Sequence, residues 1–456
     1  MPVQAPSTDR VNRRRTRPLT ATVATIAALA AGAGAAAPAA HGATDPLLVD
    51  QWALSDPDAT GAPEAWTQST GDGVLVAVLD SGVQLNHPDL AASLWRNPAE
   101  IPGNGADDDR NGYVDDVHGA NIITSGGNVD DDEGHGTHVA GIVAARAGNG
   151  TGGAGIAPGA RIMAVKVLDA RRTGNSTLLA RGIRYAVDEG ARILNVSLNG
   201  DGTSPDLDDA LRYAGEHGAT VVASAGNNAR DLDLRPSYPA SSSLPAVLSI
   251  TAAEQSGDLL AAANRGLQSV DLAAPGASIL STARGSSYEL RAGTSMAAPF
   301  VAGSLALLSA ARPDLSQNAL RDALLQSAPR PSLLAGLLGS GRLDVAAAMH
   351  RVLPGEMWRQ ATAATSRARL RVLAKSRVRA GRTASVRWRF NGPERVASWR
   401  VLLDGRRVGT VRAGRRSLLR KRVHRPGRHR WKVVGLDSTG ARVVTAARRF
   451  RVVRGR

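Results

Sequence analysis

The stretch VLVAVLD at residues 74–80 sets the fold class that we expect for this chain of 456 residues. An apolar run without alternation is typical of a strand buried on both faces of a parallel sheet. Similar stretches are RIMAVKVL (161–168), ARILNVSL (191–198), ATVVASAG (219–226) and AVLSITAA (246–253). Helical patterns lie between them at 138–147, 176–190 and 206–218. This alternation predicts an α/β fold, a doubly wound and mostly parallel sheet with helices on both faces.

Polar residues stand where these strands end. Asp80 and Ser197 close two of the strands, and Asn227 follows a third. Ligands and chemistry gather at the carboxyl ends of the strands in such sheets. A buried carboxylate also needs a partner. His135, which lies between two glycines in DEGHGTH, is a natural partner for Asp80.

The stretch GTSMAAPFVAG at 293–303 allows two interpretations. In the first, Ser295 is a helix N-cap, with Pro299 in the first turn, where its missing N–H costs nothing. In the second, Ser295 is a nucleophile at the mouth of a buried helix, whose N-terminus favours developing negative charge. Taken singly, His135 and Asn227 likewise fit a structural histidine and a turn residue.

Together the motifs favour the catalytic interpretation. VLDSGV, GHGTHVAG, SLNG, ASAGN and GTSMAAP follow one another within about residues 45–350, and this set resembles the subtilisin-like serine peptidases. The order Asp, His, Ser along the chain is the known order of subtilisin, and the resemblance includes it.

The resemblance implies a role for each residue. Asp80 would orient the base, His135 would act as general base and then acid, and Ser295 would be the nucleophile. Asn227 and the Ser295 N–H would bind the oxyanion. A peptide would add as a β-strand beside two segments around the first specificity pocket, which comprise Ser197, Leu198, Asn199, Gly200, Ala223, Ser224, Ala225 and Gly226. Their small side chains suggest an open pocket for large apolar residues, and hence broad specificity with a preference for apolar side chains. Asn199, where many relatives have Gly, weakens the expectation of an open pocket.

The acidic stretch DDDRNGYVDD at 107–116 predicts a structural calcium site. Its spacing matches the first nine positions of a calcium loop, which places the candidate ligands at Asp107, Asp109, Asn111, Tyr113 and Asp115. His118 stands where an EF-hand has Glu, so the loop is not an EF-hand. Similar acidic insertions bind calcium in subtilisin-like peptidases; the alternative is a solvated acidic turn. Asp45 and Asp89 resemble ligands of a second calcium site of the family.

Charge divides the chain. The whole chain carries +16, whereas residues 360–456 hold 29 Arg and Lys against three acidic residues, so the remainder is acidic. This tail alternates apolar and basic residues, as in SVRWRF (385–390), and contains hairpin signals such as Asp404-Gly405. We expect a small β-sandwich, immunoglobulin-like, at 372–456 after a linker at 354–371.

One face of this expected module is basic, through Arg387, Arg389, Arg400, Arg406, Arg407, Arg428 and Arg430. Adhesion to an anionic cell-surface polymer is one interpretation; a merely soluble surface, or docking onto the acidic peptidase domain, is the other. Nucleic acid is not expected as a partner, because the face has few aromatic residues for stacking.

The first residues are typical of an export signal. Five Arg precede an uncharged stretch from Leu19 to Ala40, which predicts a signal peptide at 1–43 and a peptidase domain at 44–353. An uncleaved membrane anchor is the alternative, and would be the only membrane contact. Only a few tens of residues separate this leader from VLVAVLD, although many exported relatives carry a folded pro-domain there. The chain has no Cys, which excludes disulfides and thiolate sites.

The sequence therefore predicts a secreted or cell-surface serine endopeptidase that acts on proteins and peptides. Two other functions remain open. The chain could be a catalytically inactive relative that serves as a binding module, or a transpeptidase or amidase that uses the same site.

Overall fold

The computed structural model describes residues 45–56, 58–353, 355, 369–374, 377–391, 398–412, 418–436 and 442–453. The predicted signal peptide, and the predicted linker apart from Gly355 and the residues from Arg369 onward, lie outside the described residues. All helices and strands of the described residues lie within residues 37–456, which form one unit.

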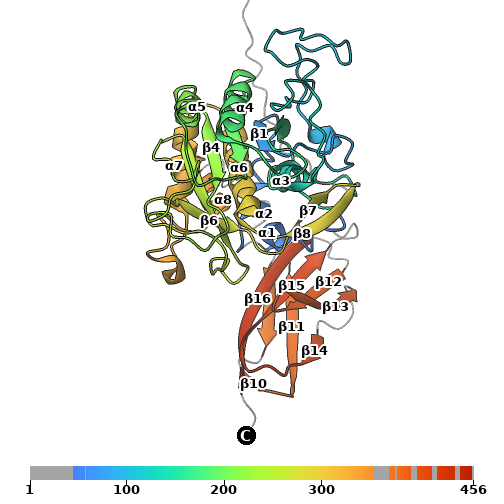
Figure 1. The fold of residues 1–456 in the computed structure, drawn as a ribbon. Helices are drawn as coiled ribbons and strands as arrows, with labels where there is room; N and C mark the ends of the chain where they lie inside the picture. Colours follow the sequence, from blue (N-terminus) through green and yellow to red (C-terminus); the bar gives the residue numbers. More distant parts are fainter. Residues whose placement is uncertain are drawn as a thin grey trace, which may run out of the picture. The chain divides into compact units, whose positions relative to one another are not determined.

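A six-stranded parallel sheet, in the order β2-β1-β3-β4-β5-β6, forms the centre of the region predicted as the peptidase domain (Figure 1). Its strands are β1 (Leu75–Asp80), β2 (Arg161–Lys166), β3 (Ile193–Val196), β4 (Thr220–Ser224), β5 (Val247–Ala253) and β6 (Leu272–Pro275). The first five coincide with the predicted strands, which are trimmed at their ends. The sequence analysis did not predict β6.

Helices cover both faces of this sheet, which confirms the predicted doubly wound α/β class. Val76 and Val78 of β1 pack into one core with residues of α3 (His135–Ala144), α6 (Thr294–Ala311), α7 (Gln317–Ser327) and α8 (Val345–Val352). Ala77 and Leu79 point the other way, towards α4 (Ser176–Asp188) and α5 (Pro205–Glu216). This alternation explains why β1 is apolar at every position up to Asp80.

Smaller elements complete this predicted domain. The short helices α1 (Trp52–Ser55) and α2 (Ala62–Ala65) add Ala53, Leu54, Ala62 and Ala65 to the core around α3 and α6. The 3-10 turns are η1 (Ala91–Ser93) and η2 (Ser332–Leu334), and β7 (Ile279–Ala283) pairs with β8 (Ser287–Arg291) as an antiparallel hairpin. By length and composition α6 could span a membrane, but 83% of it is buried, as expected of a core helix.

The C-terminal region contains two further sheets, as the alternation predicted. One sheet has the order β10-β16-β15-β12-β13 and the other β14-β11-β9. Their strands are β9 (Arg369–Ala374), β10 (Arg377–Arg379), β11 (Thr383–Asn391), β12 (Ser398–Leu403), β13 (Arg406–Arg412), β14 (Leu418–Arg422), β15 (Gly427–Leu436) and β16 (Arg442–Val453). The first strand begins at Arg369, inside the stretch predicted as linker.

A separate apolar core lies between these two sheets. Val386 and Trp388 of β11 meet Trp399 and Val401 of β12, and all four are buried, as the alternating pattern predicted. Trp431, which is 0% exposed, stacks on Phe450 at 5.9 Å between ring centroids. The side chain of Phe390, which the alternation in SVRWRF places on the same face as Val386 and Trp388, lies outside the described residues.

Candidate active site

Asp80 is the last residue of β1, and its side chain is fully buried. One carboxylate oxygen accepts the Ser81 N–H at 2.7 Å. Both oxygens lie within hydrogen-bond distance of His135 Nδ1, at 2.8 and 2.9 Å. The buried carboxylate therefore has the histidine partner that the sequence predicted, and it fixes which ring nitrogen carries the proton, leaving Nε2 as the free acceptor.

His135 is the first residue of α3, so the N-terminal end of this helix carries the ring. The His135 N–H donates to Glu133 Oε2 at 2.7 Å. The next residue has to be glycine, because a Cβ on Gly136 would lie 2.1 Å from Gly82 O and 3.1 Å from Asp80 Cβ. The missing side chain lets α3 approach β1 closely enough for His135 to reach Asp80.

His138, one helical turn further along, plays a structural part. Its Nε2 lies 3.1 Å from Glu289 O. Burial is the main cause that lowers the pKa of His138 to about 4, so this ring stays neutral near neutral pH. The sequence pattern GHGTH contains two histidines, and the structure gives only His135 a carboxylate partner.

Asp131 holds the beginning of α3 in place and was not singled out in the sequence. One oxygen accepts Ser81 Oγ–H at 2.9 Å and Gly134 N–H at 2.8 Å. The other accepts the N–H and the hydroxyl of Thr137, at 2.9 and 2.6 Å. Burial opposes ionisation of this carboxyl, but hydrogen bonds from Thr137, Gly134 and Glu133 outweigh it and hold the pKa of Asp131 below its usual value.

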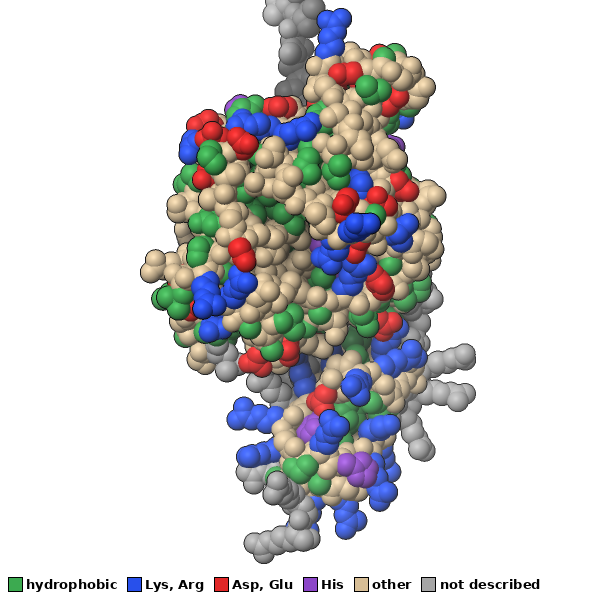
Figure 2. Space-filling model, in the orientation of Figure 1, with side chains coloured by type: hydrophobic (Ala, Val, Ile, Leu, Met, Phe, Trp, Pro, Cys, Tyr) green, Lys and Arg blue, Asp and Glu red, His purple; other side chains and the backbone are tan. Residues whose placement is uncertain are grey.

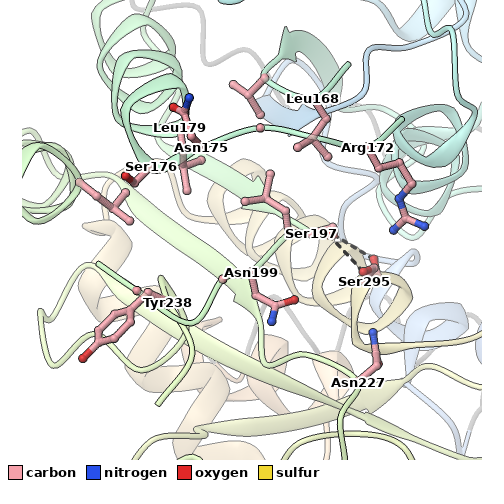
Figure 3. Close-up of a pocket in the computed structure, with 16 residues that line it drawn as sticks. Leu168, Arg172, Asn175, Ser176, Leu179, Ser197, Asn199, Asn227, Tyr238 and Ser295 are labelled. Carbon is pink, nitrogen blue, oxygen red and sulfur yellow. Dashed lines mark hydrogen bonds between the residues drawn. The ribbon is translucent and has the colours of Figure 1, made fainter. Parts of the chain in front are cut away.

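Ser295 is the second residue of α6 and is 8% exposed. The helix begins at Thr294 with Gly293 as N-cap, so Ser295 is not the cap, and Pro299 lies inside the helix instead of in its first turn. A proline has no N–H to donate to the carbonyl four residues earlier. The Ser295 carbonyl instead accepts Ser197 Oγ–H at 2.9 Å, and Ser295 Oγ–H donates to the Ser197 carbonyl at 3.1 Å (Figure 3).

This pair of hydrogen bonds brings Ser295 to the edge of the sheet where Asp80 lies. β1 and β3 are parallel with Leu79 opposite Val196, so Asp80 and Ser197 are the next residues of adjacent strands. No hydrogen bond joins Ser295 to His135 among the residues that the structure describes. Hydrogen bonds between catalytic groups are often long before substrate binds. The missing hydrogen bond therefore does not argue against Ser295 and His135 acting together.

Asn227 follows β4, and its amide has a fixed orientation. Its Oδ1 accepts the Thr294 N–H at 2.9 Å, which leaves Nδ2 free to point towards Ser295 (Figure 3). Asn264, which is fully buried and was not identified from the sequence, stabilises the loop that carries Asn227. It accepts N–H groups of Asn228 and Arg230 and donates to Ala225 O at 2.8 Å.

A cleft of about 480 Å³ opens beside Ser295 and Asn227. Of the predicted substrate-binding residues, Ser197, Leu198, Asn199 and Gly200 line it (Figure 3). The other predicted segment, Ala223 to Gly226, is buried and does not line it. Leucines at 168, 179, 198 and 207 contribute apolar walls.

The predicted calcium ligands do not all lie in one cluster. Asp109 clusters with Glu100 and Asp116, whose carboxylate oxygens all lie within 4.8 Å of one another. Asn111 contacts this cluster through its Nδ2, which donates to Asp116 Oδ2 at 2.9 Å, whereas its Oδ1, the atom that could bind a cation, accepts the Tyr113 N–H at 2.9 Å. Glu100 and Asp116 had not been identified from the sequence.

The other predicted ligands lie elsewhere in the loop. Asp107 accepts the backbone N–H groups of Asn111 and Gly112, and Asp115 accepts those of Gly103 and Gly105. Tyr113 packs its ring against Tyr185, with centroids 5.0 Å apart.

Comparisons with known proteins identify relatives of this chain. The model of the subtilase family of peptidases matches residues 71–366. Thermitase of Thermoactinomyces vulgaris is 36% identical over 288 residues, which cover 63% of this chain and 92% of thermitase. A thermophilic serine proteinase of Bacillus sp. strain AK1 is 36% identical over 289 residues, 63% of this chain and 65% of that proteinase. A protease structure from Pseudoalteromonas arctica PAMC 21717 aligns with a TM-score of 0.57 and 29% identity, covering 68% of this chain and 99% of that one.

Replacing Asp131 tests how much its carboxylate, whose pKa is lowered, contributes to the free energy of unfolding. A carboxyl whose folded pKa is depressed stabilises the fold above its usual pKa of about 3.9, and this contribution is lost as pH falls through the folded value. Asp131→Asn should therefore lower the free energy of unfolding by about 2 kcal/mol at pH 7, because the Thr137 donors lose a charged acceptor, and by progressively less as pH falls below about 3.9 through the folded value. Urea unfolding of both forms over this pH range, in a Ser295→Ala background, measures this. A loss that does not change with pH would contradict the assignment.

Proposed function

The chain belongs to the subtilase family and is a serine endopeptidase, and from this premise we propose that Asp80, His135 and Ser295 are its catalytic triad. The observation that carries the proposal is the buried Asp80–His135 pair, placed at the same sheet edge as the tethered Ser295. We further propose that the enzyme acts after export, on the basis of the charged and then uncharged leader.

The reaction begins at the Ser295 hydroxyl. Ser295 Oγ leaves its hydrogen bond with Ser197 O, gives its proton to His135 Nε2 and attacks the carbonyl carbon of the scissile bond. Asp80 holds the ring in the tautomer that accepts this proton and stabilises the resulting imidazolium. His135 then protonates the departing amine, and water hydrolyses the acyl-enzyme by the same proton path in reverse.

The developing oxyanion has two donors. One is Asn227 Nδ2, whose partner oxygen is held by Thr294. The second is the Ser295 N–H in the first turn of α6, where backbone N–H groups have no partner within the helix. It makes no hydrogen bond within the described part of the chain. Both donors are in place before reaction, so stabilising the negative charge needs little reorganisation.

For substrates, we propose broad specificity with a preference for apolar side chains. The cleft is walled by four leucines, and a peptide added as a strand beside Ser197 to Gly200 would lay alternate side chains along it. Binding there would come from main-chain hydrogen bonds and apolar contact, which suits many protein substrates.

We also propose that the acidic cluster holds a structural calcium ion. Glu100, Asp109 and Asp116 offer carboxylate oxygens, the ligands that Ca²⁺ prefers. Glu100 is 4% exposed, and its Oε2 is buried without a hydrogen-bond partner. Burial, together with Asp116 and Asp109, raises the pKa of Glu100. A bound cation would satisfy the orphan oxygen and remove the repulsion.

Asp45 and Asp89 support a second calcium site. The Asp45 carboxylate accepts N–H groups of Gly148, Asn149 and Gly150, and Asp89 accepts the side-chain amide of Asn149. Burial is the main cause that raises the pKa of both carboxyls, although these hydrogen bonds act against it. A cation nearby would favour their charged forms.

For the C-terminal module we propose adhesion to an anionic polymer. Arg428 and Arg451 lie directly opposite each other on β15 and β16, and both are exposed. Like charges in such cross-strand pairs are destabilising, so a polyanion that neutralised them would bind favourably. Figure 2 shows many Lys and Arg side chains on the described surface of this module. Arg430 and Lys432 already form ion pairs with Asp58 and Asp56, so they contribute less to the binding of a polyanion.

The triad proposal predicts how substitutions change peptide hydrolysis. Ser295→Ala should lower kcat by about 10⁶, as in subtilisin, and Ser295→Ala with His135→Ala should be little worse. Asn227→Leu should lower kcat by about 10²–10³, the magnitude measured for subtilisin, with little change in KM. Steady-state kinetics on a chromogenic peptide measure all three. Retention of a tenth of the activity by Ser295→Ala would overturn the nucleophile assignment.

The calcium proposal predicts a metal-dependent melting temperature. At a calcium concentration of about 100 Kd the stabilisation is about 2.7 kcal/mol, which raises the melting temperature by about 5–10 °C for a domain of this size. Glu100→Gln in the Ser295→Ala background should reduce this shift. Glu64→Gln, which replaces an exposed glutamate, serves as the control. Equal melting temperatures in calcium and in chelator would contradict the proposal.

The adhesion proposal predicts salt-sensitive retention. Arg428→Gln with Arg451→Gln should weaken binding to teichoic acid or another polyanion, without changing hydrolysis of a small peptide. Retention of the unaltered protein should fall steeply with salt, because ionic contacts are screened over about 8–10 Å at physiological ionic strength. Binding that is independent of salt, or unchanged in the double variant, would refute adhesion through this face.

A further inference from the structure

Asn199 belongs to the Ser197–Gly200 segment, and its side chain extends towards the opposite segment of the proposed specificity pocket. Its Nδ2 donates to Ser237 Oγ at 2.8 Å, and Ser237 is only 1% exposed. The same amide lies against Gly226, since a Cβ placed on Gly226 would be 2.7 Å from Asn199 Nδ2. The side chain therefore crosses from the Ser197–Gly200 segment to the segment that carries Asn227.

The backbone holds both ends of this bridge. Gly200 N–H donates to Tyr238 O at 2.9 Å, and Tyr238 N–H donates to Gly200 O at 2.8 Å. These residues immediately follow Asn199 and Ser237, so the two side chains are kept in register. Figure 3 shows Asn199 between Tyr238 and Asn227, consistent with these contacts.

The shape of the cleft agrees with a closed pocket. Asn199, Gly200 and Tyr238 line the cleft, whereas the buried segment from Ala223 to Gly226 does not, and neither does Ser237. An open pocket between the two segments would expose these residues to the cleft. The cleft, which also reaches Ser295 and Asn227, therefore does not extend between the two segments.

We propose that the bridge between Asn199 and Ser237 determines specificity by restricting the residue before the scissile bond to small side chains, namely Gly, Ala or Ser. This inference rests on the proposed function, because that function places the side chain of the acyl residue between these two segments. A large side chain would have to displace the Asn199 amide from Ser237. The apolar preference of the leucine-lined cleft would then act on substrate residues further from the scissile bond.

The test compares two peptide p-nitroanilides that differ only in their last residue, Ala or Phe. The unaltered enzyme should have a kcat/KM for Ala at least about tenfold higher than for Phe, the discrimination typical of pocket size. Asn199→Gly should raise the value for Phe at least about tenfold and leave that for Ala within about threefold. The Phe/Ala ratio is independent of how much of a variant is correctly folded.

Two further variants locate the effect. Ser237→Ala keeps the Asn199 side chain but removes its acceptor, so it should raise the Phe/Ala ratio less than Asn199→Gly does. Asn128→Gly, the same substitution at an exposed loop position before α3, should leave the ratio unchanged.

Particular outcomes overturn particular claims. Equal cleavage of both substrates by the unaltered enzyme, preferred cleavage after Phe, or an unchanged ratio in Asn199→Gly would overturn the role of Asn199. A third p-nitroanilide, with Gln as its last residue, extends the comparison. If it were cleaved faster than the Ala substrate, the Asn199 amide would be binding polar side chains, and this result would also overturn the proposed role of Asn199. Hydrolysis that persists in Ser295→Ala, or no hydrolysis of any of these peptides, would overturn the proposed function itself.

Discussion

The buried contact between the Asp80 carboxylate and the His135 ring is the constraint around which the site is built. A carboxylate without solvent is costly unless it is hydrogen-bonded or paired. Within the described part of the chain, only Ser81 N–H and His135 Nδ1 lie within hydrogen-bond distance of the Asp80 carboxylate. The contact requires α3 to begin close to the end of β1. Gly136 makes that approach possible, and Asp131 anchors the first turn through Ser81 and Thr137.

The beginning of α6 is positioned by a second set of hydrogen bonds. Pro299 frees the Ser295 carbonyl from the helix, and Ser197 binds that carbonyl from the end of β3. The Thr294 N–H then orients the Asn227 amide so that its nitrogen faces Ser295 (Figure 3). Three parallel strands that end at one edge thus bring together residues from distant parts of the chain, and the helix terminus supplies a further donor.

The sequence was sufficient for the parts of the molecule that repeat or alternate. The apolar runs predicted β1 to β5, and the alternation of Trp and Arg predicted the C-terminal sheets. It could not single out Asp131 among the three consecutive aspartates 130–132, because only the fold shows which one points at α3. Likewise, Glu100 and Asp116 join Asp109 through loop geometry, and the contact of Asn199 with Ser237 depends on the path of the chain between them. The position of Pro299 was predicted wrongly, because the helix starts at Thr294 and not after Ser295.

A crystal structure of the enzyme with a peptide boronic acid would test the proposed triad and oxyanion site most directly, since boron forms a tetrahedral adduct with an activated serine hydroxyl. We expect a bond from boron to Ser295 Oγ, one boronate oxygen within hydrogen-bond distance of Asn227 Nδ2 and of the Ser295 N–H, and His135 Nε2 beside the adduct. Boron bound to another residue, or a boronate oxygen directed away from Asn227, would contradict this assignment.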